Sequence, residues 1–479
     1  MKIEPHDFAG MRITVMGLGL HGGGAAAAEY CSGHGAEVTI TDLKGEKELQ
    51  SSIDRLAGLD TVRFVLGRHE EGDFRSADLV VKNPAVPRTA HYLRLAPRIE
   101  TDISLYLSAT NARIIGITGT KGKSTTATAV AHLLRSRRAR LGGNITVSPL
   151  TFLDDEYAAD RSHAVGIEEI AVLELSSFQL GDLPLTDSFR SGSLATIEIA
   201  VLTSFMRDHQ DYYHSMEAYR RDKELLFELQ DEHGWKVIDP DADFAHHFLE
   251  RGPGRLFPIG RARAGRASRG GGARAYLDGA RGILVDEAGE RHDVFPDELP
   301  VPGEHNRRNL LFAAATAYLA GAQPDAVASE LATFDGVRHR MELVRTVGTC
   351  RFVNDSAATV PEAALAAVRS FDAPVYLIAG GTDKNLEFPL FRDIAEAARC
   401  YLLSGSATDR IIDVLSAAGL PFEGPFPSLQ DAVHAAARQA AREKGPAVVL
   451  LSPGCASFGM FRNEFDRGDQ FRAVVTDIT

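Results

Sequence analysis

The segment Gly116–Thr126, GITGTKGKSTT, constrains the fold of this chain more than any other segment. It follows an apolar run, RIIGI at 113–117, and precedes a segment at 123–134 whose apolar residues recur at helical spacing. A glycine-rich loop between a strand and a helix directs backbone N–H groups and the helix N-terminus at one point, where a phosphate can bind. Such a loop is typical of parallel α/β sheets, so we predict that fold class.

The spelling of this loop is unusual. A phosphate loop of the common type reads G-x-x-x-x-G-K-[ST], whereas the residue five positions before Gly122 is Ile117. The alternative is a glycine-rich turn with an incidental lysine, but the strand, loop and helix context favours a phosphate loop. Lys123 would then meet the β and γ phosphates, and the Ser124 hydroxyl would bind Mg²⁺. The predicted nucleotide-binding residues of the loop are Gly119, Thr120, Gly122, Lys123, Ser124 and Thr125.

Alternating strand-like and helix-like segments divide the chain into three blocks. Short apolar runs bounded by glycine, such as RITVM at 12–16 and EVTITD at 37–42, alternate with longer segments of helical period. A chain of 479 residues is also too long for a single core. We therefore predict three α/β domains. They are a Rossmann-like N-terminal domain at 1–108, a central P-loop ATPase domain with a parallel sheet at 109–337, and a Rossmann-like C-terminal domain at 338–479.

Composition narrows the class of partner. Asp and Glu number 65 against 52 Lys and Arg, a balance that argues against a nucleic-acid or anionic-membrane surface. The four cysteines are far apart and form no C-x-x-C pair, so the sequence indicates neither a zinc site nor a disulfide framework. The N-terminus lacks a basic segment followed by an apolar one, and no run approaches the ~18 apolar residues of a membrane span. We expect a cytoplasmic, monomeric enzyme that acts on small molecules, with no nucleic-acid or membrane partner.

The first block supports a second interpretation. GLGLHG at Gly17–Gly22 is a complete G-x-G-x-x-G after a predicted strand, and Asp42 ends the next strand twenty residues later. This arrangement is typical of a dinucleotide site, so an NAD-dependent dehydrogenase is the alternative from a different class. It would leave the Lys123 loop and the whole third block without a role.

Several short motifs together resemble one family. The spelling G-T-x-G-K-[ST] is similar to that of the Mur ligases and the folylpolyglutamate synthases. Further motifs follow in the order of the Mur ligases, namely ELSSFQL at Glu174–Leu180, DHQDYY with His209, YRRDK with Lys223, GEHNRRN with Asn306 and Asn309, HRME with Arg340, NDS with Asp355, GGTDK with Lys384 and LLSPGCASF with Ser457. The chain therefore resembles the Mur ligases over all three blocks.

The resemblance implies a reaction and its cofactors. It implies ATP-dependent addition of D-glutamate to UDP-N-acetylmuramoyl-L-alanine through an acyl phosphate, a step of peptidoglycan synthesis, with ATP and two Mg²⁺ ions. The implied catalytic residues are Lys123, Glu174, His209 and Lys223, and the implied metal ligands are Ser124, Glu174, His209 and Lys223. Lys223 is implied to carry a carboxyl group on its side-chain nitrogen, which turns a cation into an oxygen ligand.

The resemblance also implies the residues that bind substrates. Those for the nucleotide are Asn306, Asn309, Arg340 and Asp355, those for the uridine precursor are Gly17, Gly19, Asp42, Asn83 and Asn144, and those for the amino acid are Thr359, Lys384 and Ser457. Plainer alternatives exist for several of the implied site residues. They are an exposed strand-end carboxylate for Glu174, a solvated loop histidine for His209, an exposed helix lysine for Lys223, a helix cap for Asn306, and a surface lysine or a turn hydroxyl for Lys384, Thr359 and Ser457.

The sequence departs from the family pattern near the amino-acid pocket. Ala357 stands where lysine usually follows NDS, Gly459 stands where an acidic residue is usual, and the order of Glu464 and Phe465 is reversed. Ser204 replaces a common asparagine. These changes leave open another Mur-type or folylpolyglutamate-like ligase with a different amino acid, while a non-catalytic nucleotide sensor would not need Glu174, His209 and Lys223 together.

The arginine- and glycine-rich segment 260–274 lies apart from these motifs. No aromatic residue interleaves its arginines, so we interpret it as a solvated loop insertion instead of an RNA-binding patch.

Overall fold

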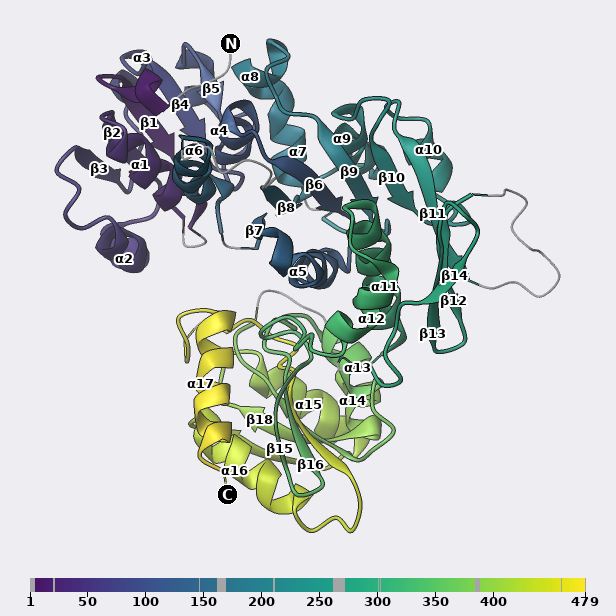
Figure 1. Ribbon diagram of the computed structural model, residues 1–479. Helices are drawn as coiled ribbons and strands as arrows, with labels where there is room; N and C mark the ends of the chain where they lie inside the picture. The colour runs from purple at the N-terminus through teal and green to yellow at the C-terminus, as the bar shows by residue number, and fades with distance from the viewer. Residues whose placement is uncertain are drawn as a thin grey trace. The chain divides into compact units, whose positions relative to one another are not determined.

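Two compact units make up the chain (Figure 1). The computed structural model describes residues 5–19, 22–145, 147–161, 169–209, 212–261, 272–299, 301, 303–383, 388–457 and 459–478. Unit 1 comprises Met1–Pro296 and Arg308–Glu330, and unit 2 comprises Asp297–Arg307 and Leu331–Thr479. Within the described residues, no helix is long and apolar enough to cross a membrane.

The first sheet of unit 1 is fully parallel, with strand order β3-β2-β1-β4-β5. Its strands are β1 Arg12–Met16, β2 Glu37–Asp42, β3 Val62–Leu66, β4 Leu79–Lys82 and β5 Ile99–Glu100, and its helices are α1 Gly23–Gly33, α2 Glu46–Arg55, α3 Glu71–Arg75 and α4 Asp102–Ala109. The strand order reverses between β1 and β4, so the loops that follow these two strands diverge and leave a crevice for a ligand. The predicted precursor residues Gly17 and Asn83 follow these two strands.

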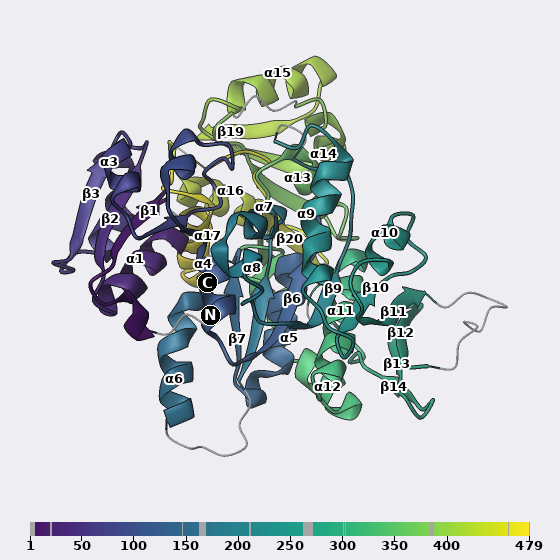
Figure 2. The same cartoon turned by 90° about the horizontal axis from the view of Figure 1, so that it is seen from above.

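The central sheet of unit 1 has the order β14-β13-β12-β11-β10-β9-β6-β8-β7. Its strands are β6 Arg113–Thr118, β7 Ala139–Gly143, β8 Ile170–Glu174, β9 Ile197–Leu202, β10 Trp235–Ile238, β11 Arg255–Arg261, β12 Arg274–Asp278, β13 Arg281–Val285 and β14 Arg291–Asp293. The helices are α5 Lys123–Leu133, α6 Leu153–Arg161, α7 Ser177–Asp182, α8 Asp187–Arg190, α9 Met216–Glu228, α10 Ala245–Leu249, α11 Glu304–Leu319 and α12 Pro324–Leu331. Helix α9, which carries Lys223, packs against β6 and β9 (Figure 2).

Unit 2 contains the third sheet, with the order β15-β16-β20-β17-β18-β19. Its strands are β15 Glu342–Val347, β16 Cys350–Asn354, β17 Val375–Ala379, β18 Ala398–Leu403, β19 Phe422–Phe426 and β20 Ala447–Leu451, and its helices are α13 Pro361–Val368, α14 Phe391–Ala397, α15 Thr408–Ala418, α16 Leu429–Ala440 and α17 Glu464–Thr476. Only β15 and β16 pair antiparallel among these described strands. Short 3₁₀ helices complete the two units at Pro5–Phe8, His91–Leu95, Arg135–Arg137, Pro149–Phe152 and Leu183–Leu185.

Apolar residues cover both faces of the parallel strands, as buried parallel sheets require. In unit 1 one continuous core joins the first and central sheets, whereas in unit 2 separate cores lie on the two faces of the sheet. The predicted α/β fold with three sheets is confirmed. The segment 260–274 begins within the last two residues of β11 and ends at the first residue of β12, and its residues 262–271 lie outside the described residues.

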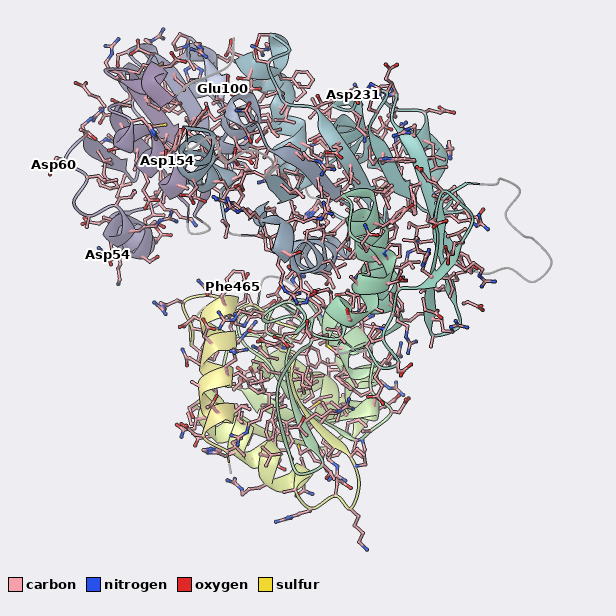
Figure 3. The ribbon with its side chains drawn as sticks, viewed as in Figure 1. Asp54, Asp60, Glu100, Asp154, Asp231 and Phe465 are labelled. Atoms are coloured by element: carbon pink, nitrogen blue, oxygen red, sulfur yellow. The ribbon has the colours of Figure 1, made fainter. Side chains whose placement is uncertain are left out.

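Charged side chains lie both at the surface and in the core (Figure 3). Asp54, Asp60, Asp154 and Asp231 are exposed. Glu100 is buried, where it accepts hydrogen bonds from hydroxyl groups of α4 and α8. Burial raises the pKa of Glu100, and these hydrogen bonds oppose the rise. This carboxyl group therefore ties β5 to the two helices beside it.

Candidate active site

The loop between β6 and α5 has the backbone geometry of a phosphate loop. Gly119 has φ +145° and Gly122, at the N-cap of α5, has φ +89°. A Cβ on Gly119 would overlap Thr203, and a Cβ on Gly122 would overlap Asn309, so neither position has room for a side chain. Among the described residues, no side chain caps α5. The N-terminus of α5 is therefore suited to an anion.

Hydrogen bonds with the residues that follow β9 hold this loop in place. The Ser204 hydroxyl accepts a hydrogen bond from the Lys121 N–H at 2.9 Å and donates one to the Lys121 carbonyl at 2.9 Å. The Thr203 hydroxyl donates to the same carbonyl at 2.6 Å, and the Thr120 hydroxyl donates to the Met206 carbonyl at 3.2 Å. Ser204, which replaces the common asparagine, thus still holds the loop through a polar side chain.

Lys223 points from α9 into the buried side of the loop. Its side chain is 1% exposed, its Nζ donates to the Gly119 carbonyl at 2.8 Å, and Nζ lies 4.8 Å from the ring centre of Tyr219. Burial lowers the pKa of Lys223 well below its ordinary value, and the charge of Lys123 lowers it further, while Asp208, Asp222 and Glu174 oppose the shift. The alternative of an exposed helix lysine is wrong.

Glu174 ends β8 with a buried carboxyl group. The residue is 2% exposed, and its Oε1 accepts a hydrogen bond from Asn144 Nδ2 at 3.3 Å. Among the described residues, Oε2 has no hydrogen-bond donor. A buried carboxylate oxygen without a donor is costly, and a divalent cation is a ligand that would satisfy it. The alternative of an exposed strand-end carboxylate is wrong, and Asn144 lies beside Glu174.

His209 lies in a strained part of the loop after β9. Its backbone has φ +51°, in the left-handed region, and its side chain is 45% exposed. The imidazole contacts Phe178 and Tyr219 with ring centres 5.2 and 6.0 Å away. Since Tyr219 also contacts Lys223, the aromatic ring connects these two predicted site residues. Ser124, in the first turn of α5, is half-buried.

Four of the predicted precursor residues, Gly17, Gly19, Asp42 and Asn83, lie at the carboxyl ends of the first sheet, whereas Asn144 follows β7 of the central sheet. Asp42 Oδ2 accepts hydrogen bonds from the N–H groups of Leu18 and Gly19 at 2.9 and 3.1 Å, and Oδ1 accepts one from Lys44 N at 2.9 Å. Asp42 therefore holds in place the loop that begins at Gly17 after β1, called the glycine loop below. The loop needs its glycines, because Gly17 has φ +93° and a Cβ there would lie 3.0 Å from that of Asn83.

The predicted nucleotide residues of α11 lie inside the helix. Asn306 is 6% exposed and Asn309 is 9% exposed. Because α11 begins at Glu304, Asn306 lies in its first turn and not at the N-cap. The helix-cap alternative for Asn306 is therefore wrong. Asn309 packs against Gly122 of the phosphate loop.

In unit 2, Asp355 follows β16 and is buried. Its carboxyl group accepts hydrogen bonds from Ser452 Oγ at 2.7 Å and from Met341 N at 3.2 Å. Burial raises the pKa of Asp355 to about 7, although these hydrogen bonds and the charge of Arg340 oppose the rise. Arg340 is exposed between His339 and Met341, whose φ angles are +64° and +49°. The strained backbone on both sides of Arg340 is typical of a functional loop.

The predicted amino-acid residues are also in unit 2. Ser457 is buried after β20, Thr359 is half-buried before α13, and Lys384 lies outside the described residues. Glu464 and Phe465, whose order is reversed relative to the family pattern, contact residues adjacent to Asp355 and Arg340. The Glu464 carbonyl accepts a hydrogen bond from Ser356 Oγ at 2.7 Å, and Phe465 contacts His339 with ring centres 5.8 Å apart.

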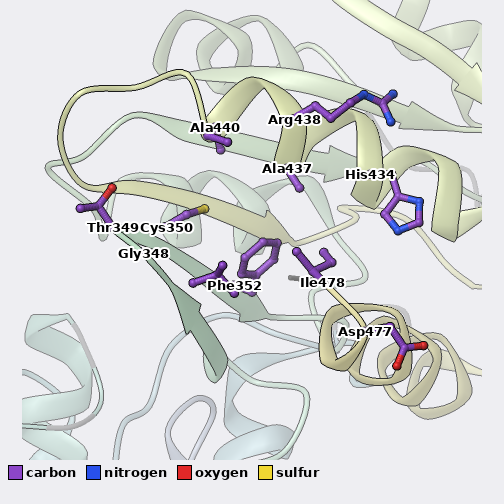
Figure 4. A pocket seen from close by; sticks show the side chains of 12 residues that line it. Gly348, Thr349, Cys350, Phe352, His434, Ala437, Arg438, Ala440, Asp477 and Ile478 are labelled. Atoms are coloured by element: carbon purple, nitrogen blue, oxygen red, sulfur yellow. The ribbon is translucent and has the colours of Figure 1, made fainter.

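A cavity of about 510 Å³ in unit 2 is lined by none of the predicted site residues that the structure describes. It lies between α16, the end of α17 and the turn at Gly348 and Thr349 (Figure 4). Burial raises the pKa of the Cys350 thiol in its wall, so this thiol is not an activated nucleophile. We assign this cavity no part in the reaction.

Sequence reasoning assigned no role to two side chains that shape the site, although both lie within motifs of the resemblance, Tyr219 in YRRDK and Asp208 in DHQDYY. Tyr219 contacts both Lys223 and His209, and Asp208 pairs with Lys121 at 3.2 Å. The spacing of four residues between Tyr219 and Lys223 could have indicated that contact, because such residues are neighbours on a helix.

The chain is similar to a set of known ligases. Residues 117–317 match the model of the Mur ligase middle domain. The UDP-N-acetylmuramoylalanine–D-glutamate ligase of Roseiflexus sp. (strain RS-1) is 40% identical over 99% of this chain and 100% of its own length. The ligase of the same name from Treponema pallidum (strain Nichols) is 37% identical over 97% of each chain. The crystal structure of UDP-N-acetylmuramate–alanine ligase from Thermotoga maritima shares the fold, with a TM-score of 0.58 and 18% identity over 97% of this chain and 99% of that one.

Proposed function

Because the chain belongs to the Mur ligase family, among the UDP-N-acetylmuramoylalanine–D-glutamate ligases, we propose how its residues carry out that ligation. The enzyme adds D-glutamate to UDP-N-acetylmuramoyl-L-alanine at the expense of ATP, in peptidoglycan synthesis. The observation that carries the proposal is that buried Lys223 donates a hydrogen bond to the Gly119 carbonyl of the phosphate loop, while the buried carboxylate of Glu174 lies close enough to oppose the lowering of the Lys223 pKa by burial.

Ligation at neutral pH requires an activated carboxyl group. A carboxylate oxygen of the precursor attacks the γ phosphorus of ATP, ADP leaves, and an acyl phosphate forms. The amine of D-glutamate then attacks the acyl carbon, loses a proton and displaces phosphate. Such transfer depends on positioning and on neutralisation of the phosphate charge. Lys123 and the N–H groups at the start of α5 supply both.

We propose that Ser124, Glu174, His209 and Lys223 hold Mg²⁺ at two sites. Bound Mg²⁺ would neutralise the phosphate oxygens during transfer. The carboxylate of Glu174 fits this role, because its Oε2 is buried and has no donor among the described residues. Lys223 fits it only as a carbamate, in which its neutral amine has added CO₂ and offers oxygen atoms. Its buried position and lowered pKa favour the neutral amine that this addition needs.

The substrates would divide among three regions of the chain. We propose residues 1–108 for the uridine precursor, 109–337 for ATP and 338–479 for the amino acid and part of the nucleotide. The precursor residues would be Gly17, Gly19, Asp42, Asn83 and Asn144, the nucleotide residues Gly119, Thr120, Gly122, Lys123, Ser124, Thr125, Asn306, Asn309, Arg340 and Asp355, and the amino-acid residues Thr359, Lys384 and Ser457. We further propose a monomer that works in the cytoplasm.

Phosphate release tests the function. The purified protein should release phosphate only with ATP, Mg²⁺, UDP-N-acetylmuramoyl-L-alanine and D-glutamate together, and L-glutamate or other amino acids should not replace D-glutamate. Lys123→Ala should lower turnover by at least about a hundredfold, because a phosphate-neutralising charge is lost. Arg281→Met, which breaks an exposed ion pair with Asp293 on a hairpin of the central sheet, should leave turnover unchanged. Near-normal turnover of Lys123→Ala would contradict the role of the loop.

The same assay tests the carbamate. Lys223→Arg should be nearly inactive although it keeps a positive charge, because a guanidinium does not form a carbamate. Lys223→Ala should regain part of its turnover when a short carboxylic acid is added, since the acid can supply the missing oxygens. Wild-type turnover of Lys223→Arg at saturating Mg²⁺ would refute the carbamate.

A further inference from the structure

A buried cluster of charges lies beside Lys223 and has no role in the reaction described above. Lys82 ends β4, Arg88 lies in the loop that follows β4, Asp182 ends α7, and Asp222 precedes Lys223 on α9. The side chains of Lys82 and Asp182 are 0% and 2% exposed, and those of Arg88 and Asp222 are 24% and 10% exposed. Two cations therefore face two anions where water has little access.

Arg88 binds carboxylates from two different helices. Its Nε donates to Asp182 Oδ1 at 3.0 Å, its Nη1 donates to Asp222 Oδ1 at 3.1 Å, and its Nη2 pairs with Asp222 Oδ2. Asp222 also accepts a hydrogen bond from Tyr213 at 2.6 Å, and Asp182 pairs with Lys82. The planar guanidinium, with donors that point in fixed directions, suits this double contact. Arg88 thus fixes α7 and α9 relative to each other.

The packing around Arg88 leaves no room for a side chain at position 181 of α7. A Cβ on Gly181 would overlap both the Arg88 guanidinium and the Asp222 carboxylate. The charged groups therefore lie directly against the backbone of α7. This close fit means that a single methyl group would displace the Arg88–Asp222 pair.

Each element that Arg88 joins carries a residue of the proposed site or begins shortly after one. Its own loop begins at Asn83, which packs on Gly17 of the glycine loop. Helix α7 begins shortly after Glu174, and α9 carries Lys223 next to Asp222. A shift of the precursor loop would therefore be transmitted through Arg88 to the helix that holds Lys223.

We propose that Arg88 is a positioning residue that couples the precursor loop 83–88 to α9 and so holds Lys223 against the phosphate loop. The proposal rests on the roles proposed above for Asn83 and Lys223. Arg88→Met keeps most of the side-chain length but removes both ion pairs. Arg88→Lys keeps the charge but cannot bind both carboxylates with one ammonium group. Gly181→Ala displaces the same pair while every charge remains.

Hydrogen exchange of the full-length protein tests the coupling without requiring turnover. In the wild type, UDP-N-acetylmuramoyl-L-alanine alone should slow amide exchange in residues 83–88 and also in α9. In Arg88→Met and Gly181→Ala, the precursor should still protect residues 83–88 but no longer α9. The turnover of both variants at saturating substrates should fall at least tenfold, and the turnover of Arg88→Lys should lie between theirs and that of the wild type. Arg281→Met and Gly72→Ala, an exposed glycine with nothing within 4 Å of its Cβ position, should behave like the wild type.

Two results would overturn the proposal. One is protection of α9 by the precursor in Arg88→Met at the wild-type level. The other is faster exchange throughout unit 1 of the unliganded Arg88→Met and Gly181→Ala variants, which would mean that the cluster only stabilises the fold. Absence of phosphate release by the wild type would instead contradict the proposed function, and the exchange data would still decide the coupling.

Discussion

At the scale of single residues, burial sets the ionisation of the groups that the site depends on. Lys223 has a pKa well below its ordinary value and Asp355 has one near 7, because both side chains are removed from water. The two shifts have the same cause and the same chemical result, since each favours the neutral form of the group. The sequence identified both residues, but their burial depends on packing between distant segments.

The stability of the protein should therefore depend on pH through Asp355. An acid whose pKa is higher in the folded state binds more protons there than in the unfolded state, so stability falls as pH rises through the folded pKa. With a folded pKa of about 7, the loss between pH 6 and pH 8 should be about 1.4 kcal/mol. In Asp355→Asn this loss should disappear, because the amide does not ionise but can still accept from Met341 and donate to Ser452.

Urea unfolding at pH 6 and pH 8, followed by circular dichroism, measures the difference. Asp372→Asn, at an exposed position of the same unit, should keep the wild-type dependence on pH. If the free energy of unfolding of Asp355→Asn depended on pH as that of the wild type does, Asp355 would already be ionised in the folded protein at pH 6.

At the scale of elements, glycines let the helices approach the ligand loops closely. Gly24 in α1 faces the backbone of the glycine loop, where its Cβ would overlap the Gly17 carbonyl and lie 2.6 Å from the Leu18 carbonyl. Gly33, at the end of the same helix, has nothing within 4 Å of its Cβ position. The close contact with the glycine loop therefore requires glycine at position 24 of α1, whereas no neighbouring atom requires it at position 33.

Substitution of these two glycines should give opposite results. Gly24→Ala should lower the free energy of unfolding by about 1–3 kcal/mol, because the extra methyl group overpacks the contact with the glycine loop. It should also weaken binding of UDP-N-acetylmuramoyl-L-alanine. Gly33→Ala should raise the free energy of unfolding by about 0.5 kcal/mol, since alanine favours a helix. Equal effects in urea unfolding would mean that the glycine loop moves to make room.

The elements differ in how far the sequence predicted them. The runs at Arg12–Met16 and Glu37–Asp42 became β1 and β2 with the predicted bounds, because apolar runs between glycines are fully buried in parallel sheets. The antiparallel strands β12–β14 were not predicted, since short strands beside an arginine-rich segment show little apolar periodicity. The Arg88 cluster was not predicted either, because its charges come from three separate segments and only Asp222 lies in a quoted motif, YRRDK, which does not reveal the partners.

At the scale of the whole molecule, three α/β sheets present loops at the carboxyl ends of their strands. In each sheet the predicted site residues follow strand ends: Gly17 and Asn83 in the first, Gly119 in the second and Asp355 in the third. The rule for open parallel sheets predicts this location from topology alone. It does not distinguish a uridine nucleotide from a dinucleotide in the first sheet, and the contacts of Asp42 must decide.

NADH should not bind to the first sheet. In a dinucleotide site the acid at the end of the second strand binds a ribose hydroxyl. Here both oxygens of Asp42 accept hydrogen bonds from the backbone of Leu18, Gly19 and Lys44. We expect no saturable change in NADH fluorescence, whereas UDP-N-acetylmuramoyl-L-alanine should bind saturably in calorimetry. Asp42→Ala should weaken that binding at least tenfold, because Leu18 and Gly19 lose the carboxylate that holds their N–H groups. Saturable NADH binding at micromolar concentrations, abolished by Asp42→Ala, would restore the dehydrogenase interpretation of this sheet.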